Sequence, residues 1–247
     1  MKKIIVKGPA LSQTGYGEET RFALRCLRSR QDIFDIYLLN TEWGKSNHII
    51  EDDEERAWLI STIQKSARYI QQGQPVFDIS LQVTIPNEFE KMAPVNIGYT
   101  AGIETTKVAP IWLQKCNEVM DKIIVISNHA KDVFVNTIVE AHDQNGNKFP
   151  YKLEKEVKVV NYPVRPQEPK DIKIDLPHDF NYVLVSQWGP RKNFENTIRW
   201  FVEENIDRDV GLVVKTNSYK NCRIDRDFTQ NRLQALLAPY KDRKCSV

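Results

Sequence analysis

The chain has 247 residues, of which 41% are hydrophobic and 28% are charged, the balance of an ordinary globular protein. Its 35 lysines and arginines stand against 33 aspartates and glutamates, and this near balance argues against a broad nucleic-acid-binding or polybasic membrane surface. The four cysteines form no CxxC pair and the four histidines show no ligand spacing, so we expect neither a disulfide framework nor a metal site. The length suits one large domain or two small ones.

The basic start of the chain resembles that of a signal peptide only superficially. Its apolar run covers residues 4–6, which is too short for the core of a signal sequence. No apolar stretch approaches the roughly 20 residues that a membrane span needs. We therefore expect a cytoplasmic protein, with peripheral contact with the inner face of a membrane left open.

Strand-like and helical patterns alternate along the first two thirds of the chain. The expected strands cover residues 3–8, 34–40, 77–83, 95–100, 122–127 and 157–164. The expected helices lie near residues 18–29, 51–73, 110–121 and 128–141, and residues 142–152 resemble a polar loop or hairpin. This alternation predicts an α/β fold of βαβ units, with a mostly parallel Rossmann-like sheet and ligand-binding loops at the carboxyl ends of its strands.

A second βαβ pattern follows a stretch, residues 165–179, that has three prolines and no strong period. Its expected strands cover residues 181–187 and 210–216, and its expected helices cover 194–205 and lie near 226–240. The final KCSV resembles the start of another strand. We therefore expect an N-terminal domain over 1–164, a linker over 165–179 and part of a second Rossmann-like domain over 180–247 that continues beyond Val247. A small extension packed on one large domain is the alternative.

The loop after the first strand, in SQTGYGEETRFAL (12–24), carries Gly15 and Gly17. Glycines allow a close approach that side chains would block, and the helix N–H groups behind them suit a phosphate or sugar oxygen. The stretch is not GxGxxG, and a purely structural turn is an equal alternative.

Two further strand ends carry polar side chains. Glu104 follows the expected strand 95–100 and could accept hydrogen bonds from sugar hydroxyls or stabilise developing positive charge, although capping the helix after Pro110 is an equal alternative. Ser127 ends the strand 122–127 at an N-cap position, and helix capping is the favoured interpretation for it.

The basic stretch SQWGPRKNFENTIRWF (186–201) places Arg191, Lys192 and Asn193 where an expected buried strand gives way to a helix. A helix start favours negative charge, so cations there suggest that an anion arrives as a ligand. Arginine offers a planar fork and lysine a point charge, which together suit a diphosphate. Lys215 ends the next expected strand, at the same edge of the sheet. Solvated surface charge is the alternative.

Taken in this order, the four stretches resemble the retaining glycosyltransferases of family 4, which have the GT-B fold, and the resemblance is strongest in three places. The matching stretches are GYGEETRFAL, VNIGYTAGIETTKVAPIWLQKCNEVMDKIIVISNHAKDVF and VSQWGPRKNFENTIRWF. The resemblance implies two Rossmann-like domains facing a cleft, the first binding mainly the acceptor and the second a nucleotide-sugar. The sugar would pass with retention to a glycan, lipid-linked or other acceptor, in polysaccharide or glycoconjugate assembly.

The resemblance also implies roles for individual residues. Lys192 and Arg191 would hold the diphosphate, which basic side chains and helix N-termini would stabilise without a metal or other cofactor. Gly15 and Gly17 would line the phosphate end of the cleft, and Glu104 and Ser127 would lie near the sugar or acceptor. Asn193 and Lys215 would complete the donor-binding edge.

The chain departs from the family pattern in three places. Gln187 stands near the position of a common family arginine, and the histidine that often follows the strand ending at Thr100 is missing. Glu195 and Glu203 have the separation of the family's two donor-binding glutamates, but lack the glycines that normally follow the first, so we expect the real pair beyond Val247. The 247 residues alone are therefore expected not to catalyse transfer.

Two rival functions remain open at this stage. A nicotinamide-dependent oxidoreductase of the Rossmann class would need the GxGxxG loop, which is missing. A non-catalytic glycosyltransferase-like binding or scaffolding module is the stronger alternative.

Overall fold

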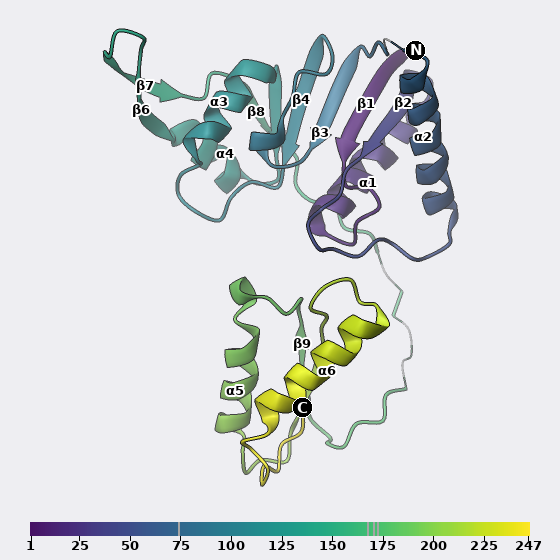
Figure 1. Ribbon diagram of the computed structural model, residues 1–247, viewed down its shortest axis with the longest axis vertical. Helices are drawn as coiled ribbons and strands as arrows, with labels where there is room; N and C mark the ends of the chain where they lie inside the picture. Colours follow the sequence, from purple (N-terminus) through teal and green to yellow (C-terminus); the bar gives the residue numbers. More distant parts are fainter. Residues whose placement is uncertain (74, 167, 170, 172) are drawn as a thin grey trace. The chain divides into compact units, whose positions relative to one another are not determined.

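A computed structural model describes residues 1–73, 75–166, 168–169, 171 and 173–247 (Figure 1). The chain divides into two compact units. The first comprises Met1–Gly44 and His48–Arg165, and the second comprises Lys45–Asn47 and Pro166–Val247. Of the linker expected over 165–179, positions 167, 170 and 172 lie outside the described residues.

The first unit is built on a parallel six-stranded sheet, as the sequence predicts (Figure 1). Its strand order is β2-β1-β3-β4-β5-β8, and every neighbouring pair is parallel. The strands are β1 (Lys2–Gly8), β2 (Phe34–Asn40), β3 (Ile79–Val83), β4 (Val95–Thr100), β5 (Lys122–Val125) and β8 (Glu156–Val159). This is a Rossmann-like arrangement, in which the loops that leave the carboxyl ends of the strands share one edge of the sheet.

The helices of the first unit are α1 (Gly15–Arg28), α2 (Glu54–Gln71), α3 (Pro110–Val119) and α4 (Asn128–Asn136), with a short 3₁₀ turn η1 (Pro86–Glu88). They bury two apolar clusters. One joins β1, β2 and β3 to α1 and α2 through Leu24, Leu38 and Leu59. The other joins β5 and β8 to α3 and α4 through Leu113 and Phe134. Both clusters fix the sheet edge from which the candidate loops leave.

The expected helix over 128–141 is too long. The structure ends α4 at Asn136 and places Ile138–His142 in β6, which pairs antiparallel with β7 (Lys148–Lys152). Thr137 is the C-cap, with extended backbone, and its hydroxyl donates to the carbonyl of Val133 and accepts the N–H of Val108. The β-branched run that begins there also favours a strand. The hairpin alternative expected for residues 142–152 is therefore confirmed, but the hairpin begins at Ile138 and takes the place of the last helical turn.

The second unit has a two-stranded parallel sheet and two long helices. Its elements are β9 (Asn181–Val185), a 3₁₀ turn η2 (Pro190–Lys192), α5 (Phe194–Glu204), β10 (Gly211–Lys215) and α6 (Arg223–Leu237). Near the end of the chain, Ser246 forms a parallel bridge with Gly211. This bridge agrees with the strand start expected at KCSV.

The expectation that the strand at 181–187 is buried is wrong. Side chains alternate across β9, so Leu184 packs against the core of the second unit while Val183 and Val185 lie on the opposite face. Val183 is 71% exposed and Val185 is 65% exposed. The helices of this unit bury only one face of the two-stranded sheet among the described residues.

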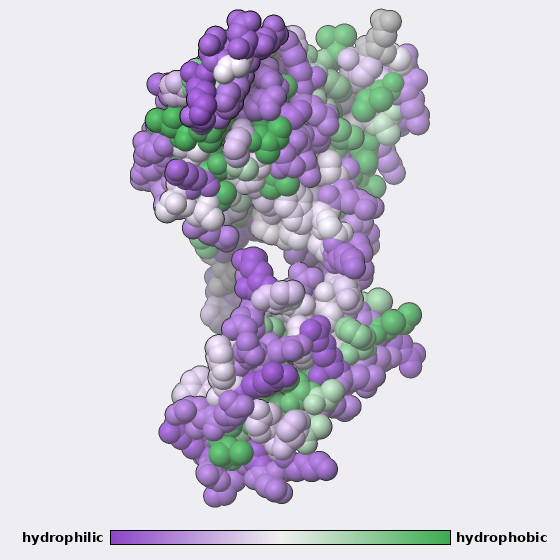
Figure 2. All heavy atoms as spheres, turned by 60° about the vertical axis from the view of Figure 1, so that its left-hand side comes forward, coloured by the Kyte–Doolittle hydropathy of each residue, from purple (hydrophilic) through white to green (hydrophobic). Residues whose placement is uncertain are grey.

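Hydrophilic residues cover most of the visible face in Figure 2, and the apolar patches between them are small and separated. Within the described residues, no helix combines the length and the apolar character that crossing a bilayer requires.

The edge strand β2 gains a hydrogen bond from α2, and this contact is testable. The N–H of Leu38 donates to Oγ of Ser66 at 2.7 Å, and both groups are buried. We expect Ser66→Ala to lower the free energy of unfolding by about 1–3 kcal/mol, because it leaves a buried N–H without a partner. Denaturant unfolding measures this loss. Ser61→Ala, at an exposed position of the same helix, should change stability by less than about 0.5 kcal/mol, and equal losses would contradict the assignment.

Candidate functional site

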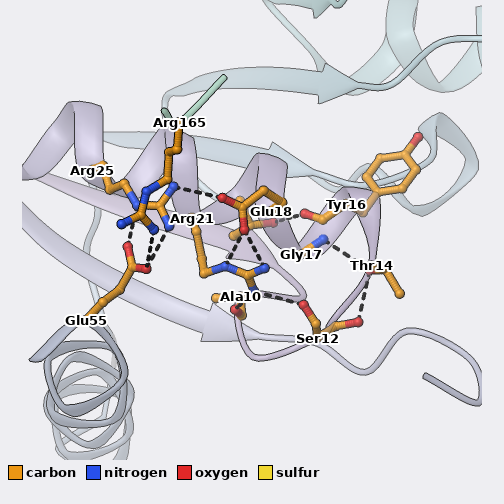
Figure 3. Close-up of polar contacts among 11 residues, drawn as sticks. Ala10, Ser12, Thr14, Tyr16, Gly17, Glu18, Arg21, Arg25, Glu55 and Arg165 are labelled. Carbon is orange, nitrogen blue, oxygen red and sulfur yellow. Dashed lines mark hydrogen bonds and ion pairs between the residues drawn. The ribbon is translucent and has the colours of Figure 1, made fainter. Parts of the chain in front are cut away.

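Residues 9–14 connect the carboxyl end of β1 to α1 (Figure 3). We call this segment the glycine loop because it leads into Gly15 and Gly17, which lie in the first turn of α1. Thr14 caps the helix, since its Oγ1 accepts the N–H of Gly17 at 3.1 Å. A Cβ at Gly17 would overlap the carbonyl oxygen of Ser12, whereas a Cβ at Gly15 would meet nothing within 4 Å. Gly17 is therefore required by the close packing of loop against helix, and Gly15 is an exposed first residue of that helix.

The guanidinium of Arg21 holds this loop in place (Figure 3). It donates to the carbonyl of Ala10 at 2.6 Å and to that of Ser12 at 2.8 Å. It also binds Oε2 of Glu18 through two N–H groups, at 3.0 and 2.7 Å. Arg21 is only 6% exposed, so its charge is satisfied by buried acceptors and is not offered to a ligand.

An ion-pair network extends from Arg21 to α2. Glu18 binds Arg25 at 3.0 Å, and Arg25 in turn binds Glu55, which also lies 3.8 Å from Arg165. Burial opposes ionisation of Glu18, but hydrogen bonds from Arg25 and Arg21 outweigh it and lower its pKa. The network ties the glycine loop to two helices.

Glu19 differs sharply from its neighbour. Its side chain is fully buried, and neither carboxylate oxygen has a hydrogen-bond partner among the described residues. Burial without compensation raises its pKa from 4.5 to about 8. The carboxyl group therefore carries a proton at neutral pH.

Tyrosines surround this region of the sheet edge. The hydroxyl of Tyr16 shares a hydrogen bond with Oγ1 of Thr100 at 2.9 Å and accepts the N–H of Ala101 at 3.2 Å. Burial is the main cause that raises the pKa values of Tyr16 and Tyr99 to about 12, and Glu19 adds to both shifts. Tyr16 and Tyr99, both neutral at neutral pH, thus lie within electrostatic range of the buried carboxyl.

The other predicted residues of the first unit lie on neighbouring loops. Ser127 is the N-cap of α4, with its Oγ accepting the N–H of Ala130 at 3.1 Å, so the predicted capping role is confirmed. Glu104 is exposed in the loop between β4 and α3. The N-cap of α3 is Ala109, so Glu104 does not occupy the cap position that the alternative interpretation gave it.

The basic turn, Arg191, Lys192 and Asn193, lies between β9 and α5 in the second unit, and all three side chains are exposed. Asn193 adopts the left-handed conformation, with φ of 49°, and begins α5 without a side-chain cap. Lys215 is the last residue of β10 and pairs in register with Val185, the last residue of β9. The turn and Lys215 therefore share the carboxyl edge of this sheet.

A cavity of about 240 Å³ adjoins the basic turn, with Trp188, Asn193 and Arg232 among its lining residues. Arg232 donates to Oε1 of Glu195 at 3.0 and 2.6 Å and lies over the ring of Trp188. Glu203 accepts a hydrogen bond from Tyr240. Glu195 and Glu203 thus bind side chains of their own unit.

The sequence interpretation missed Glu19, Tyr16 and Arg21. It placed the start of the first helix near residue 18, whereas α1 begins at Gly15. Counting from Gly15, helical spacing puts Tyr16, Glu19 and Ala23 on one stripe with buried Leu24, which is the signal that would have identified a buried carboxyl. Among the described residues, no group of three or more His, Cys, Asp or Glu side chains is arranged to hold a metal ion.

The two glycines provide a direct test of the loop packing. We expect Gly17→Ala to destabilise the protein by about 1–3 kcal/mol, because the new Cβ must displace the Ser12 carbonyl. Gly15→Ala should leave stability unchanged or raise it by up to about 1 kcal/mol, since alanine favours helix at an open position. Thermal unfolding of both variants checks this, and a similar loss in both would show that the loop is not closely packed.

The buried carboxyl predicts an unusual pH dependence of stability. The folded state holds the Glu19 proton more tightly than the unfolded chain does. The contribution of this proton to the stability of the fold is therefore complete below pH 4.5 and is lost as the pH rises to about 8. Glu19→Gln should therefore gain about 2–4 kcal/mol of stability over the wild type between pH 5 and pH 9. Glu18→Gln should be less stable than the wild type over the same range, because it loses the ion pairs of Glu18. If the stability of the wild type and that of Glu19→Gln changed with pH in the same way, the raised pKa of Glu19 would be refuted.

Comparisons with known proteins add no family assignment to this geometry. No protein-family model matches the chain. A search of curated proteins likewise finds no match.

Proposed function

We propose that the chain belongs to a retaining glycosyltransferase of family 4 with the GT-B architecture. It would move a sugar from a nucleotide-sugar donor to a glycan, lipid-linked or other acceptor. The first unit would be the acceptor-side domain and the second unit part of the donor-side domain. The proposal is supported by the order of the motifs along the chain and by their positions after the strands β1, β4, β5 and β9.

The basic turn carries the proposal. Lys192 is exposed and makes no ion pair among the described residues, and it precedes the N-terminus of α5 by two residues. The positive end of the helix dipole and the ammonium group act together on the same region. An anion bound there would be stabilised by both, and a diphosphate supplies one. Lys215, which also makes no ion pair among these residues, stands at the neighbouring strand end.

In the proposed reaction, Arg191 and Lys192 stabilise the negative charge that develops on the leaving diphosphate. Asn193 offers its amide beside them. In the first unit, the first helical turn of α1, which contains Gly15 and Gly17, would offer N–H groups to a phosphate. Glu104 would stabilise positive charge on the sugar ring, and the Ser127 hydroxyl would donate to a sugar or acceptor oxygen.

The proposal is tested by removing one charge in the longest natural form of the protein. We expect Lys192→Ala to lower kcat/KM for the nucleotide-sugar by roughly 10²–10³-fold, the usual effect of losing one group that stabilises transition-state charge. Lys241→Ala, at an exposed position beyond α6, serves as the matched control and should leave the rate unchanged. Transfer is followed by release of the nucleoside diphosphate from a panel of nucleotide-sugars.

Two results would count against the proposal. Undiminished transfer by Lys192→Ala would remove the basic turn from the mechanism. Binding of a nucleotide-sugar without any turnover by the wild type would instead favour a non-catalytic glycosyltransferase-like module.

A further inference from the structure

The buried carboxyl of Glu19 has no part in the proposed transfer, and it lies in the second turn of the helix that begins at the glycine loop. Gly15 is the first residue of α1, and Glu19 follows it by four residues, which corresponds to a rise of about 6 Å along the axis. The carboxyl therefore lies close behind the helix N-terminus. Its full burial and two unpartnered oxygens set it apart from the ion-paired Glu18 beside it.

The cations near this region have other partners. Arg21 is bound by the Ala10 and Ser12 carbonyls and by Glu18. Lys7, at the end of β1, donates to the carbonyl of Glu88 and pairs with a second glutamate at 2.9 Å. Neither is available to compensate a charge on Glu19.

The titratable groups that face Glu19 are tyrosines from three elements. Tyr16 belongs to α1, Tyr99 to β4, and Tyr162 to the segment after β8; Glu88 of η1 faces Tyr16 in turn. Glu19 is among the causes that raise the pKa values of all three tyrosines, which places them within electrostatic range of its carboxyl group, whereas burial alone raises the pKa of Glu19. An ionised Glu19 would therefore be a buried negative charge with neither a hydrogen bond nor an ion pair among the described residues.

We propose that anion binding at the glycine loop requires the protonated form of Glu19, so that the site loses its affinity as this carboxyl ionises. The inference rests on the proposed function, which places a diphosphate at the N-terminus of α1. A neutral carboxyl leaves the attraction of the helix N-terminus intact, whereas a carboxylate behind it repels the ligand. For two unit charges about 8 Å apart at an effective dielectric constant near 20, the repulsion weakens binding roughly thirtyfold.

The coupling also requires a proton balance. At a pH where Glu19 is ionised in part of the molecules, the anion binds the molecules in which Glu19 is protonated. Binding therefore shifts the equilibrium, and each Glu19 carboxylate that becomes protonated takes one proton from the solvent. No bond other than that O–H bond forms or breaks.

The experiment measures the affinity of the 247-residue chain for inorganic pyrophosphate by calorimetry at pH 7 and pH 9. We expect the wild type to bind roughly tenfold more weakly at pH 9 than Glu19→Gln does, while the two agree at pH 7. Titration of pyrophosphate itself affects both proteins equally and cancels in the comparison. Glu118→Gln removes an exposed carboxylate on α3 and should follow the wild type at both pH values.

A second measurement needs no variant. With ¹³C-labelled glutamate side chains, we expect one carboxyl resonance of the wild type to titrate far above the others and to shift to still higher pH when pyrophosphate is added. Binding that is equally strong for wild type and Glu19→Gln at pH 9, or a resonance unmoved by pyrophosphate, would overturn the coupling and leave the proposed function standing. No pyrophosphate binding at either pH would overturn the coupling together with the diphosphate site.

Discussion

The conformation of the glycine loop depends on a single guanidinium, that of Arg21. By binding the carbonyls of Ala10 and Ser12, it turns both oxygens towards α1. The C=O and N–H of a trans peptide unit point in opposite directions, so the N–H of Gln13 points away from Arg21. One buried cation thus turns two carbonyls of the loop inward and leaves the N–H of Gln13 on the other side. The N–H groups of Leu11 and Ser12 are bound within the protein, to Asn40 and Pro9.

Glu18 and Glu19 show how strongly position alone decides the state of a carboxyl group. They are adjacent in sequence and identical in chemistry, but Glu18 faces two arginines while Glu19 faces tyrosine rings. The pKa of the first is lowered and that of the second is raised to about 8. Hydrogen bonds to the charged form explain the first shift, and desolvation explains the second. The helix therefore presents one fixed negative charge and one group that responds to pH.

Much of the fold follows from the hydrophobic pattern. The β2 and β4 segments have the predicted bounds, and the order of strands and helices in both units agrees with the pattern. The misassignments arise where tertiary contacts decide. At the end of α4, the hydroxyl of the C-cap Thr137 accepts the N–H of Val108, which is distant in sequence. Val183 and Val185 are apolar but exposed, because periodicity reveals which residues share a face and not whether anything covers that face. Glu19 was missed for a different reason: the helix was expected to start near residue 18, and glutamate is a residue type that is seldom buried without a partner.

In the second unit, the packing of α5 against α6 decides which charged side chains near the start of α5 are paired and which are not. Its first turn contains Glu195, the kind of residue that a helix N-terminus favours. Arg232 of α6 binds that carboxylate and also lies over Trp188, so the pair contributes to the contact between the two helices. Lys192 is left without a carboxylate among the described residues, at the positive end of the same helix. The carboxylate of Glu195 is thus neutralised within the unit by Arg232. The charge of Lys192, at the carboxyl edge of the sheet, is the one that a bound diphosphate would neutralise.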